Sequence, residues 1–359
     1  MLLRCAGVFH CMGSDGTDGG RTDGDRVLVL NPVSGDETRV DDVVELARDH
    51  GFEVRRTERS GDGKRLAHEA AVDAGLVAAA GGDGTIHEVV NGVFDADALG
   101  STTVAVVPTG TGNNFATNVG IEGIEHAFEA IDRGRRRIID LGIANDLAFV
   151  NSCVGGLTAE ASDETSSESK RNLGVLAYVK TTLQTARSFD SLPLRVESAV
   201  GPDGERGRTW DGEALFVLVG NCRRFNGTRT AQANVEDGLF ELTIVEAASA
   251  PELLGDAAFE RLFGRDGKHI VRLRTPSLSI ESGGEPVGYS LDGEILETER
   301  LVLETNPGAL EVVVTESYRA DPDADGTPWP LGRQLERKAS NGVRSTRSKD
   351  DTGFTSRDN

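Results

Sequence analysis

The feature that most constrains the fold is a unit in which a short apolar run ends in a glycine-containing turn and a helix-forming segment follows. Apolar runs at 27–30, 76–80 and 103–107 all have this form, and a further strand-like run covers 52–57. Helices are expected near 37–50, 63–74 and 85–93. Strands that alternate with helices in this way indicate an open, mainly parallel sheet. Ligands of such sheets bind beyond the carboxyl ends of the strands.

The pattern changes after about residue 140. Strands are expected at 147–153, 193–198, 213–220, 239–246, 270–280, 287–291 and 301–304, with two helices near 172–188 and 251–263. This succession is typical of a mostly antiparallel β domain. The predicted fold class is therefore α/β plus β: an open, Rossmann-like N-terminal α/β domain and a C-terminal, mainly antiparallel β-sandwich. The strands near 301–316 are candidates to pack back on the first domain.

The same reading divides the chain into four parts. Residues 1–24 form a polar extension expected to be disordered, within which Met12 is an alternative start to Met1. Residues 25–140 form the α/β domain and 141–317 the β-rich domain. Residues 318–359 are charged and lack periodic apolar positions, so a disordered tail is expected there.

Charge restricts the partners of this chain. The sequence holds 59 Asp and Glu against 38 Lys and Arg, a net charge of −21. Such a field repels nucleic acid, and an acidic, lysine-poor composition predicts adaptation to a salt-rich cytoplasm, as in a halophilic archaeon. No apolar run approaches the ~20 residues of a membrane span, so any membrane contact is expected to be peripheral. The four cysteines show no metal-ligand spacing, which fits a reducing cytoplasm.

Two glycine-rich turns predict an anion site. In Gly81-Gly-Asp-Gly-Thr85 a strand ends in backbone that carries few side chains, and the following helix directs its positive end at the same point. Asp83 is a candidate to orient a metal ion or a hydroxyl, or to cap its helix. Pro108–Asn114 repeats the arrangement on the next strand, and Asn31–Gly35 is a third turn. A Walker A lysine motif and a Rossmann glycine fingerprint are both missing from the sequence, so the predicted phosphate-binding turns are of another kind.

These motifs resemble those of the diacylglycerol kinase and sphingosine kinase superfamily. The likeness rests on N-P-V-S-G at 31–35, G-G-D-G-T-I-H-E-V-V-N-G at 81–92 and P-T-G-T-G-N-N-F-A at 108–116. It continues in weaker matches at 140–142, 149–151, 170–178, 236–239 and 291–294. It implies a kinase that transfers phosphate from ATP, with Mg²⁺, to a lipid hydroxyl. The α/β domain would bind the nucleotide, and the active site would lie in the cleft between the two domains.

The resemblance also implies residue roles. The ATP contacts would be Asn31, Pro32, Ser34, Gly35, Thr57, Gly81, Gly82, Asp83, Gly84, Thr85, Glu88, Gly110, Thr111, Gly112 and Asn113. Glu294 would be the catalytic base, Asp140 would assist through magnesium-bound water, and the sphingosine kinases give Asp83 a central role. A structural Mg²⁺ would be held by the carboxylate of Asp237 with the neighbouring backbone of Asn234 and Leu239. Without the resemblance, Asp237 reads as part of a hairpin turn and Glu294 as a surface carboxylate.

Two departures bear on the acceptor. His87 replaces an asparagine of the bacterial diacylglycerol kinases, and Asn114 replaces an aspartate. Diacylglycerol, dialkylglycerol, a phosphoinositol-like head group and an isoprenoid alcohol therefore all stay open as acceptors. An NAD kinase-like enzyme and a non-catalytic nucleotide- or lipid-binding module are the alternative functions. The expected location is cytoplasmic and peripheral at the inner membrane surface, and a homodimer is one assembly that stays open.

Overall fold

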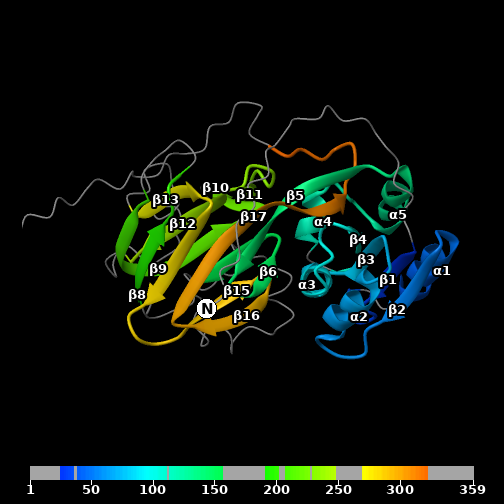
Figure 1. The fold of residues 1–359 in the computed structure, drawn as a ribbon, viewed down its shortest axis with the longest axis horizontal. Helices are drawn as coiled ribbons and strands as arrows, with labels where there is room; N and C mark the ends of the chain where they lie inside the picture. The colour runs from blue at the N-terminus through cyan, green and yellow to red at the C-terminus, as the bar shows by residue number, and fades with distance from the viewer. Residues whose placement is uncertain are drawn as a thin grey trace, which may run out of the picture.

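The computed structural model of the 359-residue chain describes residues 25–35, 39–110, 113–156, 191–201, 207–226, 229–247 and 269–321. Several predictions lie outside these residues: the extension at 1–24, the helices near 172–188 and 251–263, Thr111, Gly112 and the tail beyond 321. Figure 1 shows two units side by side, an N-terminal one with helices and a C-terminal one of strands. A single 15-stranded mixed sheet runs through both units.

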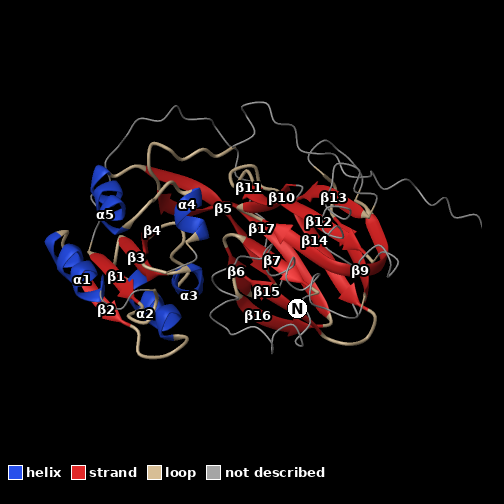
Figure 2. Ribbon diagram, turned by 180° about the vertical axis from the view of Figure 1, so that it is seen from behind, coloured by secondary structure: helices blue, strands red, loops and turns tan. Residues whose placement is uncertain are grey.

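The N-terminal unit is a parallel sheet covered by helices. Its strands are β1 (Arg26–Leu30), β2 (Phe52–Arg56), β3 (Leu76–Gly81) and β4 (Thr103–Pro108), in the order β4-β3-β1-β2. Its helices are α1 (Val40–Asp49), α2 (Asp62–Ala71), α3 (Asp83–Asp95), α4 (Asn114–Asn118) and α5 (Ile124–Arg133). Helices α1 and α5 pack together, as do α2 and α3 (Figure 2). The predicted strands and the open parallel sheet are confirmed.

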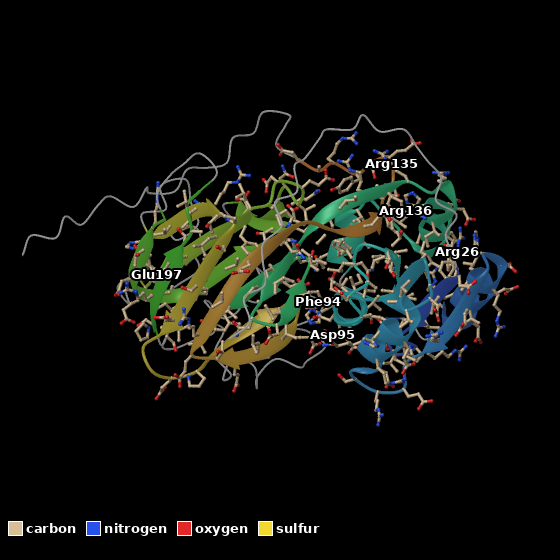
Figure 3. The ribbon with its side chains drawn as sticks, in the orientation of Figure 1. Arg26, Phe94, Asp95, Arg135, Arg136 and Glu197 are labelled. Atoms are coloured by element: carbon tan, nitrogen blue, oxygen red, sulfur yellow. The ribbon has the colours of Figure 1, made fainter. Side chains whose placement is uncertain are left out.

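Apolar residues at helical spacing explain why these helices pack as they do. The buried residues Ala67, Ala70 and Ala71 of α2 and Val89, Val90 and Val93 of α3 form stripes three or four positions apart. Figure 3 shows Phe94 and Asp95, in the last turn of α3, on the side of the unit that is turned towards the strands of the C-terminal unit. Lys64 of α2 pairs with Asp95 at 2.8 Å. Helix α3 also contacts β6 (Leu147–Phe149), so it lies at the junction of the two units.

The C-terminal unit is built mainly from antiparallel strands. These are β5 (Arg136–Ala144), β6 (Leu147–Phe149), β7 (Ser152–Gly155), β8 (Leu192–Ser198), β9 (Thr209–Gly220), β10 (Arg223–Asn226), β11 (Arg229–Gln232), β12 (Phe240–Glu246), β13 (Ile270–Thr275), β14 (Ser277–Ser282), β15 (Val287–Leu291), β16 (Glu294–Thr298) and β17 (Arg300–Val313). Their inner faces enclose a second core, in which Phe149 stacks on Phe240 at 5.6 Å between ring centroids. The sandwich prediction is confirmed.

Strand β17 joins the two units. It pairs antiparallel with β14 and β5, and its residue Val312 pairs in parallel with Val104 of β4. The expectation that the last strands pack back on the first domain is therefore confirmed. Beyond β17, Tyr318 is buried and its hydroxyl donates to Glu236 at 2.8 Å. Tyr318, assigned to the charged tail from the sequence, thus packs on the fold.

Candidate active site

The three glycine-containing turns meet at one edge of the parallel sheet. A Cβ added to Gly35 would lie 1.8 Å from the carbonyl oxygen of Thr109, and one added to Gly110 would lie 2.5 Å from the Cα of Gly82. Gly35 also has a φ of +79°, which favours glycine. The turns therefore touch backbone to backbone, as their sequence predicts.

Hydrogen bonds fix the turns in this arrangement. The Asn31 side-chain amide donates to Thr85 Oγ1 at 3.3 Å, and its Oδ1 accepts from the N–H of Val33 at 3.2 Å. The N–H of Thr109 donates to the carbonyl of Gly81 at 3.2 Å. Helix α3 begins at the same edge, so the positive end of its dipole lies among the turns. This edge is suited to binding an anion.

Asp83 connects two of the turns rather than capping its own helix. Its carboxylate accepts hydrogen bonds from the N–H of Asn114 (3.1 Å), the side-chain amide of Asn114 (2.8 Å) and the N–H of Phe115 (3.0 Å). It therefore caps the N-terminus of α4. Burial raises the pKa of Asp83, the hydrogen bonds from residues 114 and 115 oppose that shift, and the negative charge of Asp292 adds to it.

Glu294 lies opposite the start of α3, although it comes from the other unit. It is the first residue of β16, directly after the two-residue turn of the β15–β16 hairpin. A Cβ added to Gly84 would lie 3.9 Å from Glu294 Oε1. The structure thus brings the carboxylate of the D-G-E motif to the G-G-D-G turn, more than 200 positions earlier in the sequence.

Asp292 is a site residue that the sequence reasoning missed. Its side chain is fully buried, and its carboxylate accepts from the N–H groups of Val150 (2.7 Å), Asn151 (2.9 Å) and Ser152 (2.9 Å). Asp292 also has a φ of +50°, which Asp tolerates better than most residues. The Asp-Gly dipeptide signals a tight hairpin turn, but nothing local to it in the sequence indicates the three donors.

Asp140 joins a different group of residues. Its buried carboxylate accepts from the N–H of Gly238 at 2.6 Å and the N–H of Gly308 at 2.8 Å. Burial raises its pKa, and the carboxylate of Glu236 adds to the shift. Asp140 therefore holds the turn at Asp237 against the bulge of β17, whereas Asp83 and Glu294 lie at the edge where the glycine-containing turns meet.

The side chains at the predicted structural magnesium site have protein partners in this structure. Asp237 Oδ1 accepts from the N–H of Leu239 at 3.0 Å, and Oδ2 pairs with Arg274. The side-chain oxygen of Asn234 accepts from the N–H of Glu236 at 3.0 Å. Within the described residues no group of three or more His, Cys, Asp or Glu side chains could hold a metal ion. The guanidinium of Arg274 faces this carboxylate, and a magnesium ion held by Asp237 and the backbone of residues 234 and 239 stays a prediction.

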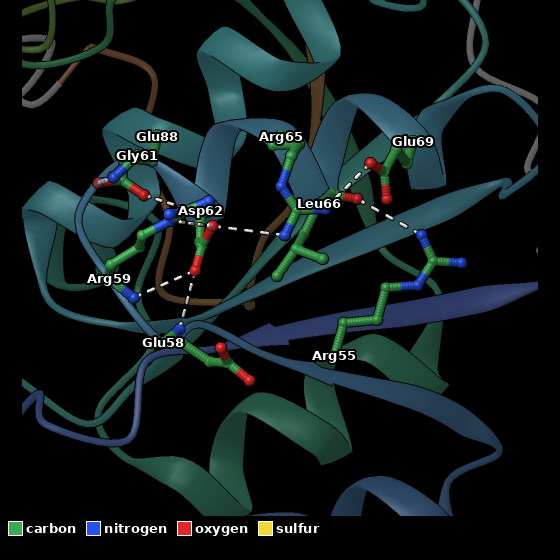
Figure 4. Close-up of polar contacts among 10 residues, drawn as sticks. Arg55, Glu58, Arg59, Gly61, Asp62, Arg65, Leu66, Glu69 and Glu88 are labelled. Atoms are coloured by element: carbon green, nitrogen blue, oxygen red, sulfur yellow. Dashed lines mark hydrogen bonds and ion pairs between the residues drawn. The ribbon is translucent and has the colours of Figure 1, made fainter.

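Glu88 and Thr57, predicted to contact ATP, have backbone partners. Glu88 accepts from the N–H of Gly61 at 3.0 Å and of Gly63 at 2.8 Å, which fixes the loop between β2 and α2 (Figure 4). The N–H of Thr57 donates to the carbonyl of Leu30 at 2.9 Å, so Thr57 lies at the same edge of the sheet as the 31–35 turn. The Asn113 side-chain amide donates to the carbonyl of Gly110 at 2.7 Å.

The fold and this site define a class of phosphotransferases with an alcohol group as acceptor. Residues 25–144 match the diacylglycerol kinase catalytic domain, and residues 151–314 match the YegS C-terminal NAD kinase beta sandwich-like domain. The chain belongs to the YegS-like family of lipid kinases. No helix among the described residues is long and apolar enough to cross a membrane.

Particular relatives support this assignment. The chain is 34% identical over 298 residues to "Probable lipid kinase YegS-like" of Pseudomonas aeruginosa, covering 81% of this chain and 94% of that protein. The protein of the same name in Pectobacterium atrosepticum is 32% identical over 291 residues, with coverages of 79% and 94%. The fold alone is also that of a crystal structure of a diacylglycerol kinase from Bacillus anthracis, which superposes with a TM-score of 0.66 at 24% identity, covering 83% of this chain and 99% of that chain. These sources are bacterial and give no support to an archaeal origin.

Proposed function

We propose that this chain transfers the γ-phosphate of ATP to the hydroxyl group of a lipid, with Glu294 as the general base. The observation that carries the proposal is the approach of Glu294 Oε1 to Gly84, at the positive end of α3. A carboxylate at that point can take the proton of an acceptor hydroxyl whose oxygen attacks the γ-phosphorus. The bond from phosphorus to the β–γ bridging oxygen then breaks, and ADP leaves.

The nucleotide would bind across the three turns. The glycines of the 31–35, 81–85 and 108–110 turns leave the backbone open to a phosphate group there. The resemblance adds Thr111 and Gly112, which lie outside the described residues. Mg²⁺ would accompany ATP as the counter-ion of its phosphates. Phosphoryl transfer needs mainly positioning and charge neutralisation from a protein, which this arrangement supplies.

The proposed acceptor is a lipid alcohol, and the proposed location of the enzyme is the membrane surface. The relatives are lipid kinases by name, which favours a lipid alcohol such as a diacylglycerol or a dialkylglycerol. A lipid substrate requires contact with a membrane surface, so the enzyme would work as a peripheral protein at the cytoplasmic side.

The test is transfer of labelled γ-phosphate from ATP to a total lipid extract in molar KCl with Mg²⁺. A labelled lipid that disappears with Glu294→Gln is expected, because glutamine keeps the shape of the side chain but cannot accept the proton. Full activity of Glu294→Gln would show that Glu294 is not the general base. Label on NAD or another soluble metabolite, with none on lipid, would overturn the lipid acceptor.

A further inference from the structure

Two buried polar side chains connect helix α3 to the hairpin that carries Glu294. They are Asn91, near the middle of α3, and Asp292, in the turn between β15 and β16. Both contact one short segment, residues 148–152, which runs from β6 to the start of β7. Figures 1 and 2 both show β6 beside α3, with β15 and β16 next to it.

Asn91 pairs with β6 as a second peptide group would. Its Nδ2 donates to the carbonyl of Ala148 at 2.9 Å, and its Oδ1 accepts from the N–H of Ala148 at 2.9 Å. The same Nδ2 donates to the carbonyl of His87 at 2.9 Å, and Asn91 is only 1% exposed. Buried amide groups are costly to leave unpaired, so these bonds fix β6 against α3.

Asp292 holds the other end of the segment. Its carboxylate accepts the N–H groups of residues 150–152, and its own N–H donates to the carbonyl of Ser152 at 3.1 Å. Glu294 follows two residues later. The hairpin that carries Glu294 is therefore tied to residues 150–152, and the adjoining residue 148 is tied to α3.

We propose that Asn91 and Asp292 are positioning residues that hold Glu294 against the N-terminus of α3 through residues 148–152. The proposal rests on the proposed function, in which Glu294 is the base. Asn91 lies about 12 Å along the helix axis from Asp83, so it does not form part of the nucleotide turns. A base displaced by about 1 Å loses on the order of 100-fold in rate, because proton transfer depends on close approach.

The first experiment measures steady-state phosphoryl transfer by Asn91→Asp. Aspartate keeps the oxygen that accepts from the N–H of Ala148. It replaces the amide donor with a second oxygen, which repels the carbonyl oxygen of Ala148. We expect kcat to fall about 100-fold while KM for ATP stays within about twofold. In the Glu294→Gln background the same substitution should cause no further loss, because its effect passes through Glu294. An equal loss in both backgrounds would overturn the proposal, as would a change confined to KM for ATP.

Thr102→Val is the matched control. Thr102 is also 1% exposed, and its hydroxyl bonds the carbonyls of Ala71 and Ala74 inside the N-terminal unit. This variant should lower thermal stability and leave kcat within about twofold. If Thr102→Val loses as much kcat as Asn91→Asp, the loss in Asn91→Asp comes from general destabilisation. That result would count against the proposal. If Asn91→Asp does not fold, Asn91→Ser, whose side chain is too short to bridge Ala148, takes its place.

Amide hydrogen exchange supplies a readout that does not need the reaction. Asn91→Asp should accelerate exchange at 148–152 and 292–296 and leave β1 and β3 unchanged. Unchanged exchange at 292–296 would overturn the proposal. A wild-type protein that phosphorylates no lipid would defeat the proposed function alone, since the exchange data would still report whether Asn91 holds the hairpin.

Discussion

Asp83 accepts hydrogen bonds from both the backbone N–H and the side-chain amide of Asn114, the latter at 2.8 Å. The bacterial diacylglycerol kinase pattern has an aspartate at this position, which would set two carboxylates against each other. With asparagine, the second side chain becomes a donor that favours the ionised form of Asp83. The departure from the family pattern therefore changes the electrostatics of the G-G-D-G turn directly.

Asn114→Ala should move the pH dependence of the reaction. Burial already raises the pKa of Asp83, and the Asn114 side chain opposes that shift. Its removal raises the pKa further, so the acidic limb of a kcat/KM profile should shift to higher pH if the ionised form is required. Asn118→Ala is the control, because Asn118 bonds Asn151 and Cys222 and not Asp83. An unmoved limb would mean that Asp83 does not titrate in the reaction.

Gly35→Ala should weaken ATP binding sharply. The added Cβ would lie 1.8 Å from the Thr109 carbonyl oxygen, so the 31–35 and 108–110 turns must separate. Gly61→Ala is a close control: Gly61 has a φ of +84° against +79° for Gly35, but nothing lies within 4 Å of its added Cβ. Both variants carry the backbone cost of about 1 kcal/mol, and only Gly35→Ala should raise the Kd for ATP at least tenfold, as calorimetry would report. Equal Kd values for the two variants would contradict contact between the turns.

Glu88→Ala should act on stability more than on nucleotide binding. Two backbone N–H groups, of Gly61 and Gly63, lose a charged acceptor, which costs about 1.5–3 kcal/mol for a hydrogen bond to a charged group. The free energy of unfolding from urea titration measures this loss. Glu69→Ala removes an exposed ion pair with Arg65 and should cost less than about 0.5 kcal/mol. A large rise in KM for ATP with unchanged stability would instead indicate that Glu88 contacts the nucleotide.

Arg274→Met should make stability strongly dependent on pH. Burial raises the pKa of Asp237, and Arg274 opposes the shift. Without the guanidinium the pKa of Asp237 in the folded protein rises further. At low pH Asp237 is protonated and the folded protein loses nothing, but as pH rises towards this pKa the buried carboxylate must ionise unpaired and stability is lost. We expect a deficit of about 1–3 kcal/mol at pH 7 that shrinks towards pH 4. Arg274→Lys keeps the charge and should behave as wild type, and a deficit independent of pH would point to lost packing alone.

Potassium chloride should stabilise the folded protein. A net charge of −21 opposes compaction, and molar salt shortens the screening length to about 3 Å. Thermal unfolding at low and at multimolar KCl tests this. A melting temperature that does not change with salt would remove the salt-adaptation hypothesis.

The sequence predicted the parallel sheet and the meeting of its turns because those features are local: apolar runs, glycines and helix starts lie close together along the chain. It placed Glu294 at the site only through the family resemblance. Strand β5 was missed because arginines and Asp140 interrupt its apolar pattern, and β16 because Glu294, Glu297 and Thr298 give an edge strand the composition of a loop.

Long-range partners account for the rest. Asp292 is fixed by N–H groups about 140 positions away, and Glu88 by groups 25 to 27 positions away. The sequence also did not indicate that Arg274, from a neighbouring strand, pairs with the carboxylate of Asp237. The pairing of distant charged side chains depends on how the strands assemble, so it cannot be predicted from a single sequence.

Strand β17 has a consequence for synthesis on the ribosome. Because it covers the edge of β4 with residues around Val312, the first sheet has an open edge until nearly the whole described chain has been translated. An open strand edge can pair with other chains, and domains generally fold as they emerge. The nascent N-terminal unit should therefore depend on chaperones or on its acidic charge to stay apart from its neighbours, and a chain truncated before residue 300 should aggregate rather than persist as a free domain.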